Sequence, residues 1–141
     1  LAIPFEIWKQ PFKYTGTLHA QTSDSALYSS EWIAIGNRWA VRGFDGENTL
    51  AAEKGWFLRN ELETPFPGTS QATYVALDLG RVFGANEFNL LGNDLAGAAI
   101  GMRGNLFKGA YYDVFVSGVL YKPQGFKTDE PTAGFSLTYQ F

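Results

Sequence analysis

The segment Phe12-Lys13-Tyr14-Thr15-Gly16-Thr17-Leu18-His19-Ala20-Gln21 decides the fold class, because apolar or small residues alternate strictly with polar ones. Successive side chains of a β-strand point to opposite faces of the sheet, so this pattern predicts a strand with one apolar and one polar face. About ten residues is also the length of a strand that crosses a bilayer at a tilt. The segment therefore favours a membrane-spanning strand over a helix.

Five further segments alternate in the same way, and they complete a set of six expected strands. These cover residues 11–22, 55–64, 71–83, 96–107, 110–121 and 133–141. Short turns at 64–71 and 108–109 alternate with long loops at 22–55, 84–95 and 122–132. Tight turns at one end of a sheet and long loops at the other are typical of outer-membrane barrels. The sequence leaves open whether residues 1–10 form the end of a strand or a turn, and Pro4 and Pro11 suggest a turn.

Composition excludes several classes of function. The chain of 141 residues has a net charge of −3, so it lacks the basic surface of a nucleic-acid-binding protein. It contains no Cys, which excludes disulfides and Cys-ligated metals. No apolar stretch reaches the 18 residues that a transmembrane helix needs, but barrel strands give a much weaker hydropathy signal.

Catalytic and cofactor sites are not indicated either. His19 is the one His of the chain, and it lies among polar residues of a strand face without a second His. We interpret it as a polar face residue, neither a base nor a metal ligand. The phosphate-binding pattern G-x-x-x-x-G-K-[ST] does not occur. We therefore expect no enzyme activity, no metal and no cofactor.

Three short motifs stand out against this pattern. The loop between the first two strands, about residues 23–54, contains Val41-Arg42-Gly43-Phe44. The polar face of the 71–83 strand carries Asp78 and Gly80, and that of the 55–64 strand carries Glu61. The final strand carries Gly134, Leu137, Tyr139 and Phe141.

In this order the motifs resemble those of the two-partner secretion transporters, which export haemolysins, filamentous haemagglutinins and contact-dependent toxins across the outer membrane. Residues 29–36, 55–62 and 121–126 also fit the family pattern. The resemblance implies an all-β, antiparallel transmembrane β-barrel of 16 strands, of which this chain supplies the last six. It also implies that the 23–54 loop is an extracellular loop folded back into the lumen.

The resemblance gives the motifs roles. It implies that Arg42 reaches Asp78 on the inner wall, with Glu61 nearby, as a lock between loop and wall. A guanidinium suits such a lock, because its planar fork pairs a carboxylate through two hydrogen bonds. The alternative is that Arg42 is a solvated loop charge, as most exposed ion pairs contribute little. The final strand resembles the signal read by the barrel-assembly machinery; alternatively, it is a last strand that simply ends on an aromatic residue.

The expected function is a pore in the outer membrane of a Gram-negative cell, through which a large unfolded partner protein leaves without nucleotide hydrolysis. The chain begins at Leu1, and six strands are too few for a barrel, so we expect a longer protein with further strands and POTRA domains upstream. A general porin or barrel-assembly factor of the same superfamily is an alternative. A soluble β-sandwich is a further one.

Deleting Phe141 tests the assembly signal. We expect less full-length protein in the outer membrane, because the assembly machinery would lose the terminal aromatic residue. The measurement is the amount of heat-modifiable, folded barrel in outer-membrane fractions. Normal assembly of the truncated protein would instead mean that the last strand has no signalling role.

Overall fold

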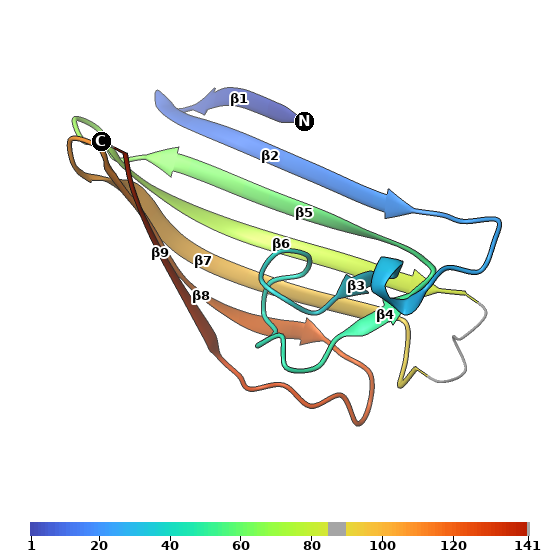
Figure 1. Cartoon of the computed structure of the whole chain (residues 1–141). Helices are drawn as coiled ribbons and strands as arrows, with labels where there is room; N and C mark the ends of the chain where they lie inside the picture. The colour runs from blue at the N-terminus through green and yellow to red at the C-terminus, as the bar shows by residue number, and fades with distance from the viewer. Residues whose placement is uncertain (85–89, 141) are drawn as a thin grey trace.

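The computed structural model describes residues 1–84 and 90–140. In these residues, one antiparallel sheet has the strand order β1-β2-β5-β6-β7-β8-β9. A second, two-stranded sheet of β3 and β4 lies across one of its faces (Figure 1). The large sheet consists of β1 (Ala2–Ile7), β2 (Gln10–Gln21), β5 (Lys54–Pro65), β6 (Gln71–Phe83), β7 (Asp94–Phe107), β8 (Ala110–Tyr121) and β9 (Thr132–Tyr139).

The sheet has one strand more at its first edge than the six that the sequence predicts. Residues 1–10, which the sequence leaves open between a strand end and a turn, contain both: Ala2–Ile7 form strand β1, paired with β2 from Ala2↔Thr15 to Ile7↔Gln10. The turn is confined to Trp8 and Lys9, which both have positive φ. Pro4 is compatible with a strand here because β1 is an edge strand of the described sheet, where a missing N–H breaks no ladder.

The other boundaries lie close to those expected from alternation. β7 begins at Asp94, two residues before the predicted start, so the loop ahead of it is shorter. Part of that loop, residues 85–89, is outside the described residues. β9 ends at Tyr139, and Phe141 also lies outside the described residues. No helix in the described part of the chain is long and apolar enough to cross a membrane.

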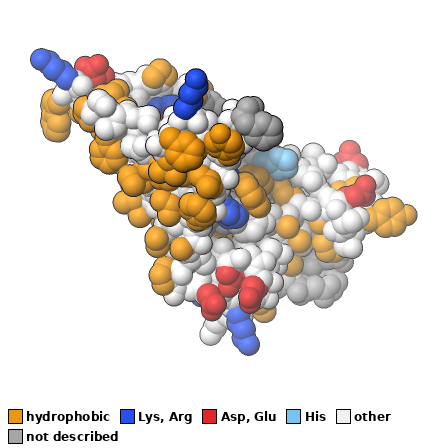
Figure 2. Space-filling view, turned by 60° about the vertical axis from the view of Figure 1, so that its left-hand side comes forward, with side chains coloured by type: hydrophobic (Ala, Val, Ile, Leu, Met, Phe, Trp, Pro, Cys, Tyr) orange, Lys and Arg blue, Asp and Glu red, His pale blue; other side chains and the backbone are white. Residues whose placement is uncertain are grey.

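The two faces of the sheet have opposite chemistry. We call the face covered by β3 and β4 the loop face and the other the apolar face. On the apolar face, Leu18, Leu77, Ile100 and Phe135 are between 44% and 66% exposed. Figure 2 shows how hydrophobic side chains gather over much of the surface in view. The alternation in the sequence therefore corresponds to a sheet that exposes its apolar side.

The chain between β2 and β5 folds onto the loop face. We call residues 22–53 the folded-in loop; it contains η1 (Ser29–Glu31), β3 (Ile33–Ile35) and β4 (Leu50–Ala52). Its apolar side chains pack with others from the sheet and from Phe126. This core comprises Ile33, Ile35, Ala40, Val41, Phe44, Leu50, Ala52, Val82, Leu95 and Phe126.

Glycines allow the loop backbone to approach the sheet closely. A Cβ added to Gly97 of β7 would lie 1.8 Å from the carbonyl oxygen of Arg42. One added to Gly43, which has φ +110°, would lie 2.5 Å from the carbonyl oxygen of Gly118. A side chain at Gly80 would meet Val41 at 2.9 Å. The loop therefore lies directly on the sheet at these positions.

Gly97→Ala should displace the folded-in loop, since the new methyl group would occupy the place of a backbone carbonyl. We expect a cost of about 1–3 kcal/mol, the usual range for overpacking. Gly118→Ala is the matched control, because a Cβ there meets nothing within 4 Å. Thermal unfolding of the two full-length variants gives the comparison, and equal midpoints would contradict the close contact at Gly97.

Candidate functional site: an ion cluster under the folded-in loop

Arg42 and Asp78 form the centre of the site. Asp78, in the middle of β6, accepts three hydrogen bonds from Arg42: from the backbone N at 3.0 Å, from Nε at 2.7 Å and from Nη2 at 2.9 Å. The two side chains are only 4% and 1% exposed. Arg42 thus binds the wall through both its guanidinium fork and its backbone, which fixes the position of the loop as well as of the side chain.

Glu61 of β5 lies between two arginines. Its Oε2 accepts from Nη1 of Arg42 at 2.8 Å, and its Oε1 lies 2.7 Å from Nη1 of Arg103 on β7. Burial disfavours the charge of Arg42, but the hydrogen bonds and charges of Asp78 and Glu61 outweigh this effect. The pKa of Arg42 therefore lies above its ordinary value, and the residue stays charged in its buried position.

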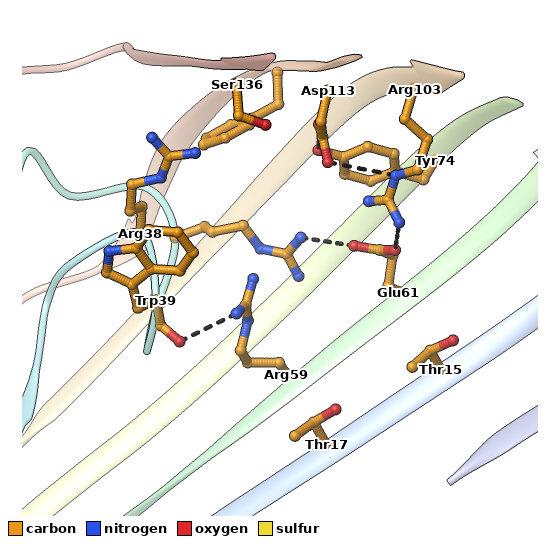
Figure 3. A pocket seen from close by; sticks show the side chains of 12 residues that line it. Thr15, Thr17, Arg38, Trp39, Arg59, Glu61, Tyr74, Arg103, Asp113 and Ser136 are labelled. Atoms are coloured by element: carbon orange, nitrogen blue, oxygen red, sulfur yellow. Dashed lines mark hydrogen bonds and ion pairs between the residues drawn. The ribbon is translucent and has the colours of Figure 1, made fainter. Parts of the chain in front are cut away.

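Arg103 extends the cluster across the sheet (Figure 3). Its Nη1 lies 3.2 Å from Glu63, its Nε 3.4 Å from Asp113 on β8, and its guanidinium carbon 3.9 Å from the centre of the Tyr74 ring. The hydroxyl of Tyr74 donates to Asp113 at 2.8 Å. Strands β5, β6, β7 and β8 are therefore linked through the side chains of their loop faces.

Arg59 and the loop tip complete the arrangement. Arg59 donates from Nη1 to the carbonyl oxygen of Trp39 at 3.1 Å, and its Nε lies 3.8 Å from Asp78. Asn37 accepts from the backbone N of Trp39 and of Ala40, at 2.9 and 3.0 Å. The tip of the folded-in loop is thus held by its own turn and by the sheet.

A cleft of about 350 Å³ opens beside the cluster. The guanidinium of Arg38 stacks there over Trp39, with centroid distance 4.8 Å, and faces Phe115 at 5.5 Å. Neutral polar groups also line this cleft: Thr15 and Thr17 from β2, and Ser136 from β9 (Figure 3). The described residues include no group of three or more His, Cys, Asp or Glu placed to hold a metal ion. The arrangement suits weak, replaceable contacts with a polar ligand or chain.

The structure brings together the loop and strand residues that the sequence singled out. Arg42, Asp78 and Glu61 are in contact, Val41 and Phe44 are buried, and Gly80 lies under Val41. The final-strand residues are elsewhere. Leu137 and Tyr139 are exposed on the apolar face, and a Cβ at Gly134 would collide with the ring of Phe115.

Sequence reasoning missed Arg103, Tyr74 and Asp113. Alternation places each of these residues on the polar face of its own strand. Alternation alone does not say which polar residues of neighbouring strands lie opposite one another. The register places Arg103 opposite Asp113, and Tyr74 opposite Glu63. Once the register is known, Arg103 lies close to acidic residues on the polar faces of other strands. This placement would have indicated the ion cluster.

Comparison with known proteins identifies the family. The family model described as "Haemolysin secretion/activation protein ShlB/FhaC/HecB" matches residues 1–104. The chain belongs to this family. This family consists of two-partner secretion transporters and not of enzymes. The resemblance to that family seen in the sequence is therefore confirmed.

Relatives support the assignment over the whole chain. Outer membrane transporter CdiB-2 of Burkholderia pseudomallei is 46% identical over 100% of this chain and 25% of its own length. Hemolysin transporter protein HpmB of Proteus mirabilis is 32% identical over 55% of this chain and 14% of its own. The solved structure of CdiB from Acinetobacter baumannii superposes with a TM-score of 0.90 at 30% identity, covering 98% of this chain. The chain spans about a quarter of the CdiB relatives that it matches.

Glu61→Gln should weaken the site more than Glu63→Gln. Glu61 pairs with two arginines, whereas Glu63 makes one longer contact with Arg103. Because Glu61 is partly exposed, we expect a loss of about 1–3 kcal/mol in unfolding free energy, below the roughly 3–5 kcal/mol of a fully buried pair. Chemical unfolding of both full-length variants measures the difference; equal losses would mean that Glu61 does not bridge the two arginines.

Proposed function

We propose that this chain forms part of the wall of an outer-membrane pore that secretes a large unfolded partner protein by two-partner secretion. The observation that carries the proposal is the opposite chemistry of the two faces. The apolar face presents exposed side chains on the other strands and half-buried ones on β5, while the loop face holds buried and half-buried charges. Such a sheet is suited to lipid on one side and water on the other.

The edges of the sheet support the proposal of a closed barrel. β1 and β9 each have one neighbour in the described sheet, which leaves backbone N–H and C=O groups unpaired at both edges. Within a bilayer such groups need partners, and a barrel supplies them by closing on itself. In a protein of the length of its CdiB relatives, further strands would pair with both edges, giving the transmembrane barrel that the resemblance implies.

The folded-in loop would then occupy the lumen. Arg42, Asp78 and Glu61 act as a lock that sets the depth of the loop, with Val41, Gly43 and Phe44 shaping the segment that carries Arg42. Three hydrogen bonds from one residue to one buried carboxylate fix this depth sharply. The position of the loop in turn determines how much of the lumen is free for a passing chain.

The proposed cargo is an unfolded haemolysin, adhesin or toxin, the class of protein whose transporters this chain resembles. Hydroxyl and guanidinium groups along the cleft offer such a chain weak hydrogen bonds that water can replace. Folding of the partner at the cell surface would bias its movement outward without nucleotide. During biogenesis, the strand with Gly134, Leu137, Tyr139 and Phe141 would be read by the barrel-assembly machinery.

Arg42→Ala tests this function in the full-length transporter. We expect normal insertion of the barrel and secretion of the partner reduced at least roughly ten-fold, since the loop loses all its side-chain contacts with Asp78 and Glu61. Arg42→Lys should remain impaired, because an ammonium cannot form the planar fork. The measurement is partner protein in the medium relative to transporter in the membrane.

Arg81→Ala provides the control. Arg81 also forms an ion pair, with Asp94 at 3.2 Å, but it is 54% exposed and outside the site. Its loss should leave secretion unchanged. Normal secretion by Arg42→Ala would refute the lock. A pore that passes small solutes but shows no dependence on a partner protein would favour a general porin.

A further inference from the structure

The folded-in loop has a second point of attachment, which lies outside the ion cluster. Residues 122–131 connect β8 to β9 and contact the folded-in loop. We call them the clasp loop. Four contacts join the two loops, and none involves Arg42, Asp78 or Glu61. Asp45, three residues after Arg42, takes part in two of them.

Asp45 both donates to and accepts from the clasp loop. Its backbone N donates to the hydroxyl of Thr128 at 3.1 Å, and its Oδ2 accepts from the backbone N of Asp129 at 2.7 Å. Its Oδ1 accepts from the backbone N of Glu47 at 3.0 Å, which closes a turn inside the folded-in loop. The carboxylate therefore joins two segments that lie more than eighty residues apart in the sequence.

Two neighbouring contacts support the same junction. Asn48 donates from its side-chain amide to the carbonyl oxygen of Lys127 at 3.1 Å. The rings of Phe44 and Phe126 meet edge to face, with centroids 5.7 Å apart, and both belong to the core beneath the loop. Phe44 and Asp45 therefore attach two consecutive positions of the folded-in loop to the clasp loop, one through a buried ring and one through hydrogen bonds.

The hydrogen bonds favour the charged form of Asp45. Donation from the backbone N of Asp129 lowers the pKa of this carboxyl, and the backbone N of Glu47 and the Thr128 hydroxyl act in the same direction. Partial desolvation of the carboxyl acts in the opposite sense but does not outweigh these hydrogen bonds. The carboxylate thus remains an acceptor at neutral pH.

The geometry of Arg42 explains why a second attachment matters. Arg42, the hydrogen bond from Arg59 to Trp39 and the apolar core attach the loop to the sheet, whereas Asp45 attaches it to a different segment of the chain. The flanking Gly43 and Gly46 have φ values of +110° and +84°, a region in which glycine is not restrained by a side chain. Contacts at Asp45, between these two glycines, remove that freedom.

We propose that Asp45 is a positioning residue for the proposed transport function: by binding Thr128 and Asp129 of the clasp loop, it keeps the folded-in loop seated so that Arg42 stays on Asp78 and Glu61. This inference rests on the proposed function for its biological meaning, while the contact itself is a property of the two loops. The clasp loop thereby becomes a further determinant of where the folded-in loop sits.

Spin-label distances in the purified full-length transporter test the proposal. Labels at Trp39→Cys on the loop tip and Thr17→Cys on β2 report the distance between loop and wall; both side chains are exposed and line the cleft. This chain has no cysteine of its own, and any elsewhere in the protein would be replaced by serine. With Asp45 intact, we expect one narrow distance distribution.

In the Asp45→Ala background, the distance distribution should broaden. The population with a displaced loop should rise roughly ten-fold, because the carboxylate no longer accepts hydrogen bonds from the backbone N of Asp129 and of Glu47. Asp45→Asn, which keeps an acceptor oxygen, should restore part of the narrow population. Thr128→Val removes a partner from the other side and should broaden the distribution as well. Combined with Asp45→Ala, it should broaden the distribution further, because the two changes remove different hydrogen bonds of one junction.

Glu47→Ala is the matched control, since it removes a carboxylate two residues away whose side chain makes no contact with the clasp loop among the described hydrogen bonds and ion pairs. It should leave the distribution narrow. An unchanged distribution in both Asp45→Ala and Thr128→Val would overturn the proposal. The distances are measured without partner protein, so failure of the secretion hypothesis would show in the Arg42→Ala assay and leave this result intact.

Discussion

The buried carboxylate of Asp78 is the constraint on which the arrangement of the loop depends. A carboxylate in the middle of a strand, with 1% of its side chain exposed, would be very unfavourable without charged and hydrogen-bonding partners. Arg42 supplies three hydrogen bonds and a compensating charge. The 36-residue separation of the pair means that this single requirement folds a long connection back onto its own sheet.

Close approach of backbones makes this pairing possible. Gly97 pairs with Asp78 in the register, so the carbonyl of Arg42 can rest where any other residue would place a Cβ. The same principle operates within the sheet, where the ring of Tyr74 covers Gly101 and that of Phe115 covers Gly134. Glycines and large side chains thus alternate across the strands, which explains why so many glycines occur in a β-structure.

The sequence predicted the strands of the sheet from β2 onward, because alternation has a direct physical meaning that does not depend on tertiary contacts. It left β1 undecided, because prolines are uncommon in strands and suggested a turn. The pairing of Arg42 with Asp78 came from the family motif, since no local pattern specifies a contact across 36 residues. Arg103 and Asp45 were missed for the same reason: their partners become neighbours only through register and through the path of the loops.

An attachment made of ions and glycines differs from an apolar one in its response to water. When an apolar plug leaves its seat, both surfaces become exposed to water, and the cost grows with their area. When Arg42 leaves Asp78 in a wet interior, water can solvate both charges and replace the lost hydrogen bonds, so the net cost is much smaller than the gross interaction. The folded-in loop has both kinds of contact, since its apolar core extends from Ile33 and Ile35 to Phe44 and Phe126 and includes Val41, the residue before Arg42. Its resting position is defined by the directional contacts, while the apolar core adds a cost of separation that grows with the buried area.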